Sequence, residues 1–171
     1  MDRTFIQIIS VVVGTVGISI YFNIDKSKLP IITLGGLISW TVYLTCTELN
    51  QNIFMSCFIS SIVISIYAEI AARLFKSPAN IFLIPSIVPL LPGGSFYHMM
   101  TGCINMDIEM IKSKGFETMM TVLGISVGVV LGFFIFKNVF NKIKTNKDKK
   151  FKREKEKEDK EIQSISPAYS D

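Results

Sequence analysis

Residues 84–94 read IPSIVPLLPGG and lie inside an apolar segment that runs from residue 81 to residue 104. A helix of about 20 apolar residues is long enough to cross the hydrocarbon core of a bilayer. Each proline inside such a helix removes a hydrogen-bond donor and clashes with the preceding turn, so an uninterrupted helix is excluded. The prolines are Pro85, Pro89 and Pro92, and Gly93 and Gly94 follow them directly. We therefore predict a membrane-spanning helix that is broken near its middle.

Four other apolar segments accompany this one. The five predicted spans are residues 5–22, 31–48, 53–74, 81–104 and 116–136. The mean hydropathy of the 171 residues is +0.43, and 11 of the 18 lysines and arginines lie at or after Lys137. Charged residues make up about a tenth of the chain before that point, against roughly a quarter in an ordinary globular protein. We therefore predict an all-α integral membrane protein with five transmembrane helices over residues 1–137.

Residues 138–171 form a charged tail of mixed sign that lacks an apolar face. Such a composition favours a solvated helix or a disordered segment over a second domain. Its basic start also suits recognition of anionic lipid. The distribution of lysine and arginine predicts the orientation, since these residues collect on the cytoplasmic side. Placing the tail there also places Lys26, Lys28, Arg73 and Lys76 there, so the N-terminus is expected outside and the C-terminus in the cytoplasm.

The composition excludes several classes of site. The three cysteines are isolated, His98 is the only histidine, and no phosphate-binding glycine loop is present. We therefore expect no metal site, no cofactor and no nucleotide-driven pump within this chain. The net charge of +4 is a property of the tail and does not indicate nucleic-acid binding.

Glu69 and Arg73 are spaced to lie on one helix face near the end of the third predicted span. Ionisable groups inside a span usually face a bundle interior or a cavity, because burying them unpaired in lipid is costly. One interpretation places Arg73 at the cytoplasmic interface with Glu69 as its partner. A second makes Glu69 a carboxylate that faces substrate or accepts a proton, and a third makes the two an ordinary packing pair.

The broken fourth span carries the most specific functional signal. Interrupted helices form the substrate and ion sites of many secondary transporters, with helix ends directed at the ligand. Gly93 and Gly94 permit close approach of a small polar solute. Hydroxyl and imidazole groups follow them directly, at Ser95, Tyr97, His98 and Thr101. His98 is a candidate proton relay, or else a polar residue satisfied at an interface. The alternative for the whole segment is a structural kink or re-entrant turn.

This part of the sequence resembles the small, five-span subunit of the threonine/serine exporter family. The resemblance rests on Glu69-x-x-x-Arg73, on Lys76-Ser77-Pro78-Ala79, and on Ile84-Pro85-x-x-x-Pro89-Leu90-x-Pro92-Gly93-Gly94 with Tyr97 after it. Ser86 stands where a glycine is usual in the family. The likeness in hydropathy covers about residues 1–137.

The resemblance implies an activity and a partner. Family members export threonine and serine, driven by the proton gradient, and in the split form a larger subunit works with a small one. A related pair is associated with succinate export, so a dicarboxylate is the alternative substrate. This chain is then expected to be the small subunit of a two-component antiporter that moves a small polar metabolite.

We therefore predict one half of a secondary efflux transporter in a bacterial plasma (inner) membrane, and not an enzyme. Glu69 and Arg73 are expected to form or gate the site. The backbone shape of this site is expected to be set by Pro85, Pro89, Pro92, Gly93 and Gly94. Tyr97 and His98 are expected to make the polar contacts to the substrate. Two other classes of protein stay open. An intramembrane enzyme would use His98 with Glu69 or Asp107, but a nucleophile or metal ligands at recognisable spacing are missing. An assembly subunit would use the proline segment only to dock a partner.

Overall fold

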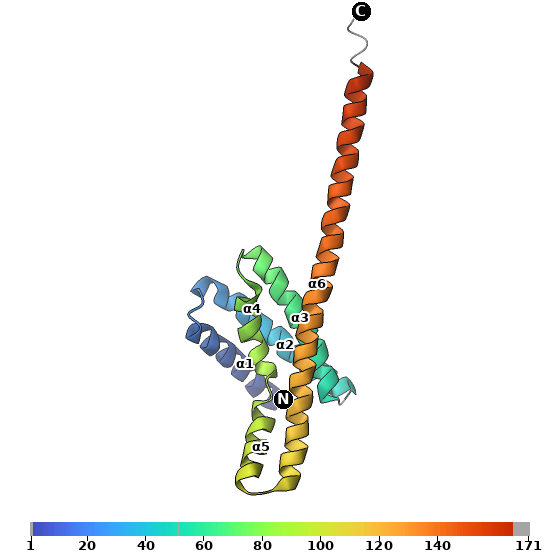
Figure 1. The fold of residues 1–171 in the computed structure, drawn as a ribbon. Helices are drawn as coiled ribbons and strands as arrows, with labels where there is room; N and C mark the ends of the chain where they lie inside the picture. The colour runs from blue at the N-terminus through green and yellow to red at the C-terminus, as the bar shows by residue number, and fades with distance from the viewer. Residues whose placement is uncertain (1, 51, 166–171) are drawn as a thin grey trace, which may run out of the picture. The chain divides into compact units, whose positions relative to one another are not determined.

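The computed structural model describes the backbone of residues 2–50 and 52–165, and side chains over residues 5–49 and 52–140 and at 142. The described residues are helical and contain no strand (Figure 1). The elements are α1 (Asp2–Tyr21), η1 (Lys26–Lys28), α2 (Leu29–Asn50), α3 (Ile53–Leu74), α4 (Ala79–Ile87), η2 (Val88–Leu90), α5 (Gly93–Ile104) and α6 (Ile108–Ile165). The predicted all-α class is confirmed. The chain divides into two compact units, Met1–Phe134 and Ile135–Asp171.

Three helices among the described residues are long and apolar enough to cross a membrane. They cover Lys26–Leu49, Ile53–Leu74 and Ile108–Phe140. A fourth span results if the bent pair Ala79–Leu90 and Gly93–Ile104 is counted as one. The first predicted span corresponds to the shorter apolar helix Phe5–Tyr21. The protein is thus a multi-pass membrane protein, and the fifth span stays a prediction.

The first unit is built around α3, which packs against both α2 and α4. Its larger apolar cluster comes from these three helices and is centred on Ile32, Ile64 and Phe82, all of them fully buried. A smaller cluster joins Cys57 of α3 to Leu90 of η2 and Ile125 of α6. In Figure 1 the α1–α2 connection lies at the left, the α3–α4 connection at the upper end of α3, the α2–α3 connection at the lower right and the α5–α6 connection at the bottom. The direction therefore alternates from α1 to α2, to α3, to the α4–α5 pair and to α6, as a multi-pass chain requires.

Small residues allow α6 to approach α3 closely. The sequence predicts a packing stripe from Gly124, Gly128 and Gly132, and each of them faces the α3 backbone or a buried α3 serine. A Cβ atom at Gly128 would lie 2.6 Å from the carbonyl oxygen of Phe58. This stripe is confirmed, and it uses the small-residue packing common between membrane helices. The sequence also makes Gly14 and Gly17 of α1 available for close helix packing, but in the described structure a Cβ at either position would meet nothing within 4 Å.

Three helices end in the same way, with one non-glycine residue in the left-handed conformation. These residues are Asn23, Lys76 and Met106, with φ values of 52°, 48° and 57°. After each of them an N–H group bonds to a carbonyl five residues earlier, as from Ile24 to Ser19 at 3.1 Å. This is the Schellman arrangement, which satisfies carbonyls left open at a helix end. It reverses the chain sharply after α1, α3 and α5.

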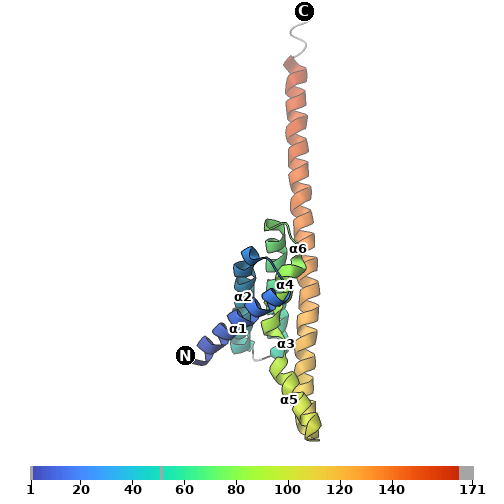
Figure 2. The same ribbon diagram turned by 90° about the vertical axis from the view of Figure 1, so that its left-hand side faces the viewer.

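The broken span occurs where it is predicted. α4 and α5 are bent by 55° relative to each other, and α5 leaves the direction of α4 just after η2 (Figure 2). Pro85 is accommodated inside α4, and Pro89 lies in η2. The helical path ends at Leu91, whose backbone is extended with ψ 137°. A residue before proline is disfavoured in the helical region, so Pro92 sets the position of the break.

The second unit begins at Ile135. Its backbone is described as helical as far as Ile165, within α6. The predicted domain boundary at residue 137 lies close to the start of this unit. The expectation of a solvated helix or a disordered tail stays a prediction.

We predict that Gly128→Ala lowers the stability of the protein, because the added Cβ collides with the α3 backbone at a position where neither helix can yield without losing its packing. The expected loss is about 1–3 kcal/mol. Thermal unfolding of the detergent-purified chain measures it. Gly14→Ala is the matched control, since it adds the same atom to a helix at a position with open space. An equal melting temperature for the two variants would contradict the α3–α6 packing.

Candidate functional site

The break between α4 and α5 leaves backbone carbonyls without their usual donors. Pro89 has no N–H group to offer the carbonyl of Pro85, four residues earlier. The carbonyl of Ser86 also lies in the last turn of α4, where intrahelical partners run out. Such groups require another partner at membrane depth, because water is absent there.

Serines from neighbouring helices supply part of that compensation. The hydroxyl of Ser39 in α2 lies 2.9 Å from the Ser86 carbonyl oxygen and 2.8 Å from that of Gly36 in its own helix. Ser86 in turn donates to the carbonyl oxygen of Ile32 at 3.0 Å, and Ser60 of α3 donates to the carbonyl of Ser39. These buried bonds connect α2, α3 and α4 and hold the α4 side of the break in place.

A hollow lies directly beside the break, and we name it the break hollow. Its volume is about 350 Å³, and its walls come from α1, α2 and η2. The lining residues are Ile6, Gln7, Ser10, Val11, Gly14, Trp40, Val88 and Pro89. The indole Nε1 of Trp40 is buried and has no hydrogen-bond partner among the described residues. The amide of Gln7 and the hydroxyl of Ser10 on otherwise apolar walls are typical of a small-molecule site.

A second hollow, the loop hollow, lies at the α1–α2 connection and the start of α4. It measures about 250 Å³ and is lined by Phe22, Asn23, Ile24, Asp25, Lys28, Asn80, Ile81 and Ile84. Lys28 and Asp25 form an ion pair at 3.0 Å at its edge. Asn80, Ile84 and Val88 are four residues apart, so the loop hollow and the break hollow open on one face of the α4 segment.

Gly93 and Gly94 begin α5 on the other side of the break. Both have negative φ values, and a Cβ added at either position would meet nothing within 4 Å. Neither turn geometry nor crowding within the described chain therefore requires a glycine there. The two glycines leave the first turn of α5 without side chains at two positions. The N–H groups of a first helical turn have no intrahelical acceptor. A helix N-terminus of this kind attracts negative charge.

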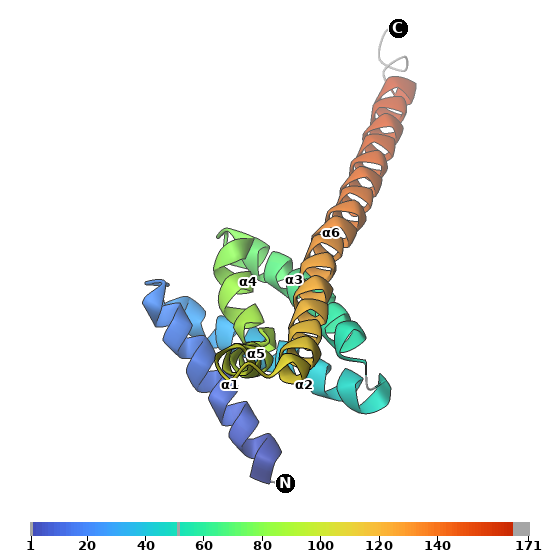
Figure 3. The ribbon, with the colours of Figure 1, turned by 60° about the horizontal axis from the view of Figure 1, so that its bottom comes forward.

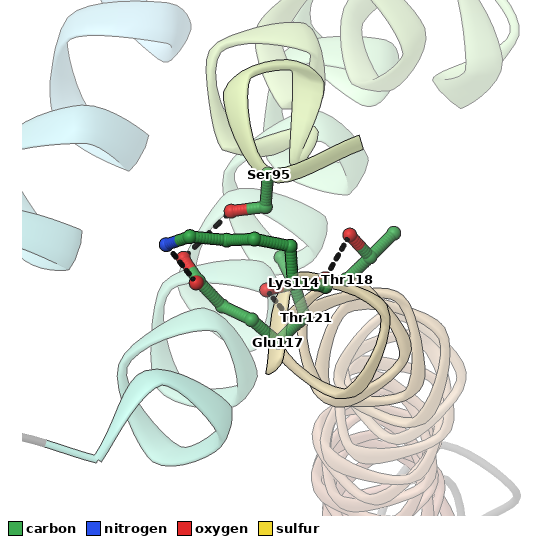
Figure 4. Close-up of polar contacts among 5 residues, drawn as sticks. All are labelled: Ser95, Lys114, Glu117, Thr118 and Thr121. Atoms are coloured by element: carbon green, nitrogen blue, oxygen red, sulfur yellow. Dashed lines mark hydrogen bonds and ion pairs between the residues drawn. The ribbon is translucent and has the colours of Figure 1, made fainter. Parts of the chain in front are cut away.

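A carboxylate from α6 lies at this first turn (Figure 4). Ser95 donates a hydrogen bond to Oε1 of Glu117 at 2.6 Å, and the ammonium of Lys114 bonds to Oε2 at 2.8 Å. Thr118 and Thr121 satisfy their hydroxyls on carbonyls of their own helix. α5 and the start of α6 lie side by side here (Figure 3), since Met99 also contacts the site of Gly115. Both carboxylate oxygens are thus occupied, and the negative charge is compensated.

A third hollow opens beside this carboxylate, and we name it the Glu117 hollow. It measures about 470 Å³ between the start of α3 and the start of α6. Its lining is Asn52, Ile53, Phe54, Met55, Phe116, Glu117 and Met120. The Glu117 side chain is 27% exposed and that of Lys114 is 38% exposed. A ligand in this hollow would therefore meet one charged group and one amide among apolar side chains.

The remaining predicted site residues divide into two locations. Tyr97 and His98 lie one turn after Ser95 in α5, both are exposed, and their rings pack edge to face at 5.6 Å. His98 is near enough to Glu117 for their charges to interact. Glu69 and Arg73 pair at 3.7 Å in the last turns of α3. The length of the Ala79–Leu90 segment, about 18 Å at helical rise, separates that end of the unit from the break.

Asp107 has a structural contact of its own. Its carboxylate accepts hydrogen bonds from the N–H groups of Glu109 and Met110, both at 3.1 Å. Those bonds cap the N-terminus of α6. The pairing of His98 with Asp107 that an intramembrane enzyme would need is not among the contacts of the described residues.

Sequence reasoning identified Ser95 as a hydroxyl next to the glycines but missed Glu117 and Trp40 as site residues. A signal for Glu117 was present, because it is the one acidic residue within the predicted span 116–136. A lone carboxylate inside a span is a functional candidate by default. Its contact with Ser95 joins residues that are 22 positions apart, and helical periodicity carries no information about such a pair.

We predict that Ser39→Ala destabilises the protein by about 0.5–2 kcal/mol, because it removes the hydroxyl that faces the Ser86 carbonyl at the break. Ser10→Ala is the matched control. The Ser10 hydroxyl bonds only to the carbonyl of Ile6 in its own helix and is exposed, so we expect little change. Thermal unfolding in detergent measures both. A smaller loss for Ser39→Ala than for Ser10→Ala would contradict a bracing role for the α2 serine.

Comparison with known proteins adds one match. The family described as "Threonine/Serine exporter, ThrE" matches residues 7–135. Neither a curated protein nor a solved structure matches the chain. The matched region covers the break, the loop hollow, the Glu117 hollow, the Ser95–Glu117–Lys114 cluster and the lining of the break hollow apart from Ile6.

Proposed function

Because the chain belongs to the threonine/serine exporter family, we propose that it is one subunit of a proton-coupled secondary transporter that exports threonine, serine or similar small polar metabolites. The observation that carries the proposal is the 55° break between α4 and α5 with the break hollow beside it. Broken helices at a polar hollow are the usual substrate sites of secondary transporters.

The proposed mechanism is alternating access around the break. The loop hollow and the break hollow lie along one face of α4, and together they supply a route from the α1–α2 connection toward the middle of the unit. Leu91 and Pro92 are the hinge, because their backbone leaves the helical path there. Pro85, Pro89, Gly93 and Gly94 shape the site around this hinge.

Three titratable side chains are available to couple transport to protons. Glu117 and His98 lie next to the break, and Glu69 lies with Arg73 near the end of α3. In this proposal the first two face the substrate, with Tyr97 as a further polar contact. Glu69 and Arg73 gate the opposite end, where an ion pair can open and close as the helices move.

The proposed orientation places the α1–α2 and α3–α4 connections in the cytoplasm of a bacterium, together with the C-terminus. Lys26, Lys28 and Lys76 lie in or beside these connections, and basic residues favour the cytoplasmic side of a plasma membrane. The N-terminus and the α5–α6 connection then face outward.

We propose a larger subunit of the same family as partner. Helices α1, α5 and α6 of the first unit expose many large apolar side chains, among them Phe5, Phe96 and Phe134. Lipid can cover such faces, but up to four spans and one shorter helix are few to enclose a solute path. A second subunit would complete the wall that this chain leaves open beside the break.

Deleting the chain from its host is expected to abolish efflux of threonine from preloaded cells, because the proposed path would lose one of its walls. Efflux should return only when this chain and the larger subunit are expressed together. Radiolabelled threonine in the medium measures it. Full export by this chain without the larger subunit would contradict the need for a partner.

Pro89→Ala is expected to reduce export on the order of tenfold, which corresponds to about 1.4 kcal/mol on the rate-limiting barrier. The substitution restores an N–H group that can bond to the Pro85 carbonyl, which would extend the α4 helix toward the hinge at Leu91 and Pro92 and stiffen that side of it. Pro78→Ala is the matched control, since Pro78 precedes α4 and lies outside the break.

Co-purification of Pro89→Ala with the larger subunit shows whether the proline segment serves transport or only assembly of the complex. Loss of flux with an intact complex supports the transport role. Loss of the complex itself would favour the assembly subunit, in which the proline segment only docks the partner. Normal flux in Pro89→Ala would contradict the proposed role of Pro89 beside the hinge.

A further inference from the structure

The Lys114–Glu117 pair combines features that an ordinary surface ion pair lacks. Glu117 lies within the apolar helical segment Ile108–Phe140, about 14 Å along α6 from its start. Both of its carboxylate oxygens are hydrogen bonded, one by Ser95 and one by Lys114. The pair is nevertheless only partly covered, and Glu117 lines the hollow of about 470 Å³. A small solute can therefore reach it.

We propose that Lys114 and Glu117 form the recognition site for a zwitterionic α-amino acid, an inference that rests on the proposed export function. The substrate ammonium replaces the Lys114 ammonium on Oε2 of Glu117, and the released Lys114 binds the substrate carboxylate. Ser95 stays on Oε1 and holds the Glu117 carboxylate in place. One ion pair is thereby exchanged for two, with no change in net charge.

The charge balance of the exchange selects the substrate class. Separating two charges in low-dielectric surroundings is strongly unfavourable when either is left uncompensated. A zwitterion brings one charge of each sign and compensates both. A dicarboxylate would satisfy Lys114 but repel Glu117, and an amine would satisfy Glu117 but leave Lys114 unpaired. The Lys114 and Glu117 charges therefore disfavour a dicarboxylate or an amine and at the same time bind a zwitterion.

The lining of the Glu117 hollow is consistent with a small side chain. Apart from Glu117 and Asn52 it consists of apolar residues, Phe54 and Phe116 among them. Asn52 supplies an amide that can meet a hydroxyl group. A charged group on the side chain of the substrate would have no partner among these lining residues, whereas a short hydroxylated side chain could meet Asn52.

The test compares three probes that share a hydroxylated carbon chain and differ in which charged groups they carry. L-Threonine carries both groups, threoninol lacks the carboxylate, and 3-hydroxybutyrate lacks the ammonium. Binding is measured in membranes that contain the full chain together with its larger subunit, with Glu117→Gln and Lys114→Gln as the variants. Lys112→Gln is the matched control, because this exposed lysine lies on the same helix outside the described ion pairs.

Wild type is expected to bind threonine in preference to both analogues. In each variant the affinity for threonine should fall on the order of tenfold or more, because one charge of the substrate loses its partner. Lys114→Gln should in addition gain affinity for threoninol, and Glu117→Gln should gain affinity for 3-hydroxybutyrate and succinate. Lys112→Gln should behave as wild type.

The reciprocal gains separate recognition from a structural role, because a misfolded or weakened protein does not bind a new ligand better. Unchanged discrimination in both variants, or an equal loss for every probe, would overturn the proposed site. If those variants still export threonine and discriminate as wild type does, the site is wrong and the export function stands. If wild type neither binds nor exports any of the probes, both proposals fail.

Discussion

The structure depends on one constraint: a backbone carbonyl at membrane depth must have a donor, and proline removes donors. The α4 segment contains prolines at positions where an unbroken helix would need N–H groups. Ser39 answers part of this demand from α2 by placing its hydroxyl at the Ser86 carbonyl. Water is absent from the hydrocarbon and cannot donate to these carbonyls. A neighbouring helix must therefore lie close and carry a donor side chain opposite each unpaired carbonyl. The position of α2 against α4 follows from this need.

Close approach in turn depends on small residues. α3 carries buried serines toward α2 on one side and toward α6 on the other, at Ser60 and Ser61 respectively. Gly128 and its neighbours in the α6 stripe have no side chain to keep the two backbones apart. The same choice of residues therefore serves packing and hydrogen bonding at once. In lipid both contribute to helix association, because apolar side chains are as well solvated by lipid as by each other.

The two sides of the break differ in character. On the α4 side, hydrogen bonds from serine hydroxyls connect three helices. The break hollow there is lined mainly by apolar side chains, and Gln7, Ser10 and Trp40 are the exceptions. On the α5 side the glycines leave the helix start bare, and the charges of Glu117 and Lys114 lie close to it. A braced half and a less crowded, charged half on either side of a hinge are suited to a transporter, which must bind a polar solute and then change its exposure.

The sequence by itself determined which segments are helical, where the fourth apolar segment breaks, and which face of α6 carries small residues, because these follow from local rules of proline geometry and helical period. It did not determine which helix packs against each helix face. Gly14 and Gly17 look equivalent to the α6 glycines in sequence, yet they face open space. Glu117 could be identified as a lone acid in a span, but its bond to Ser95 depended on how α5 folds back beside α6. Periodicity describes one helix at a time, and only tertiary packing decides which helices share a site.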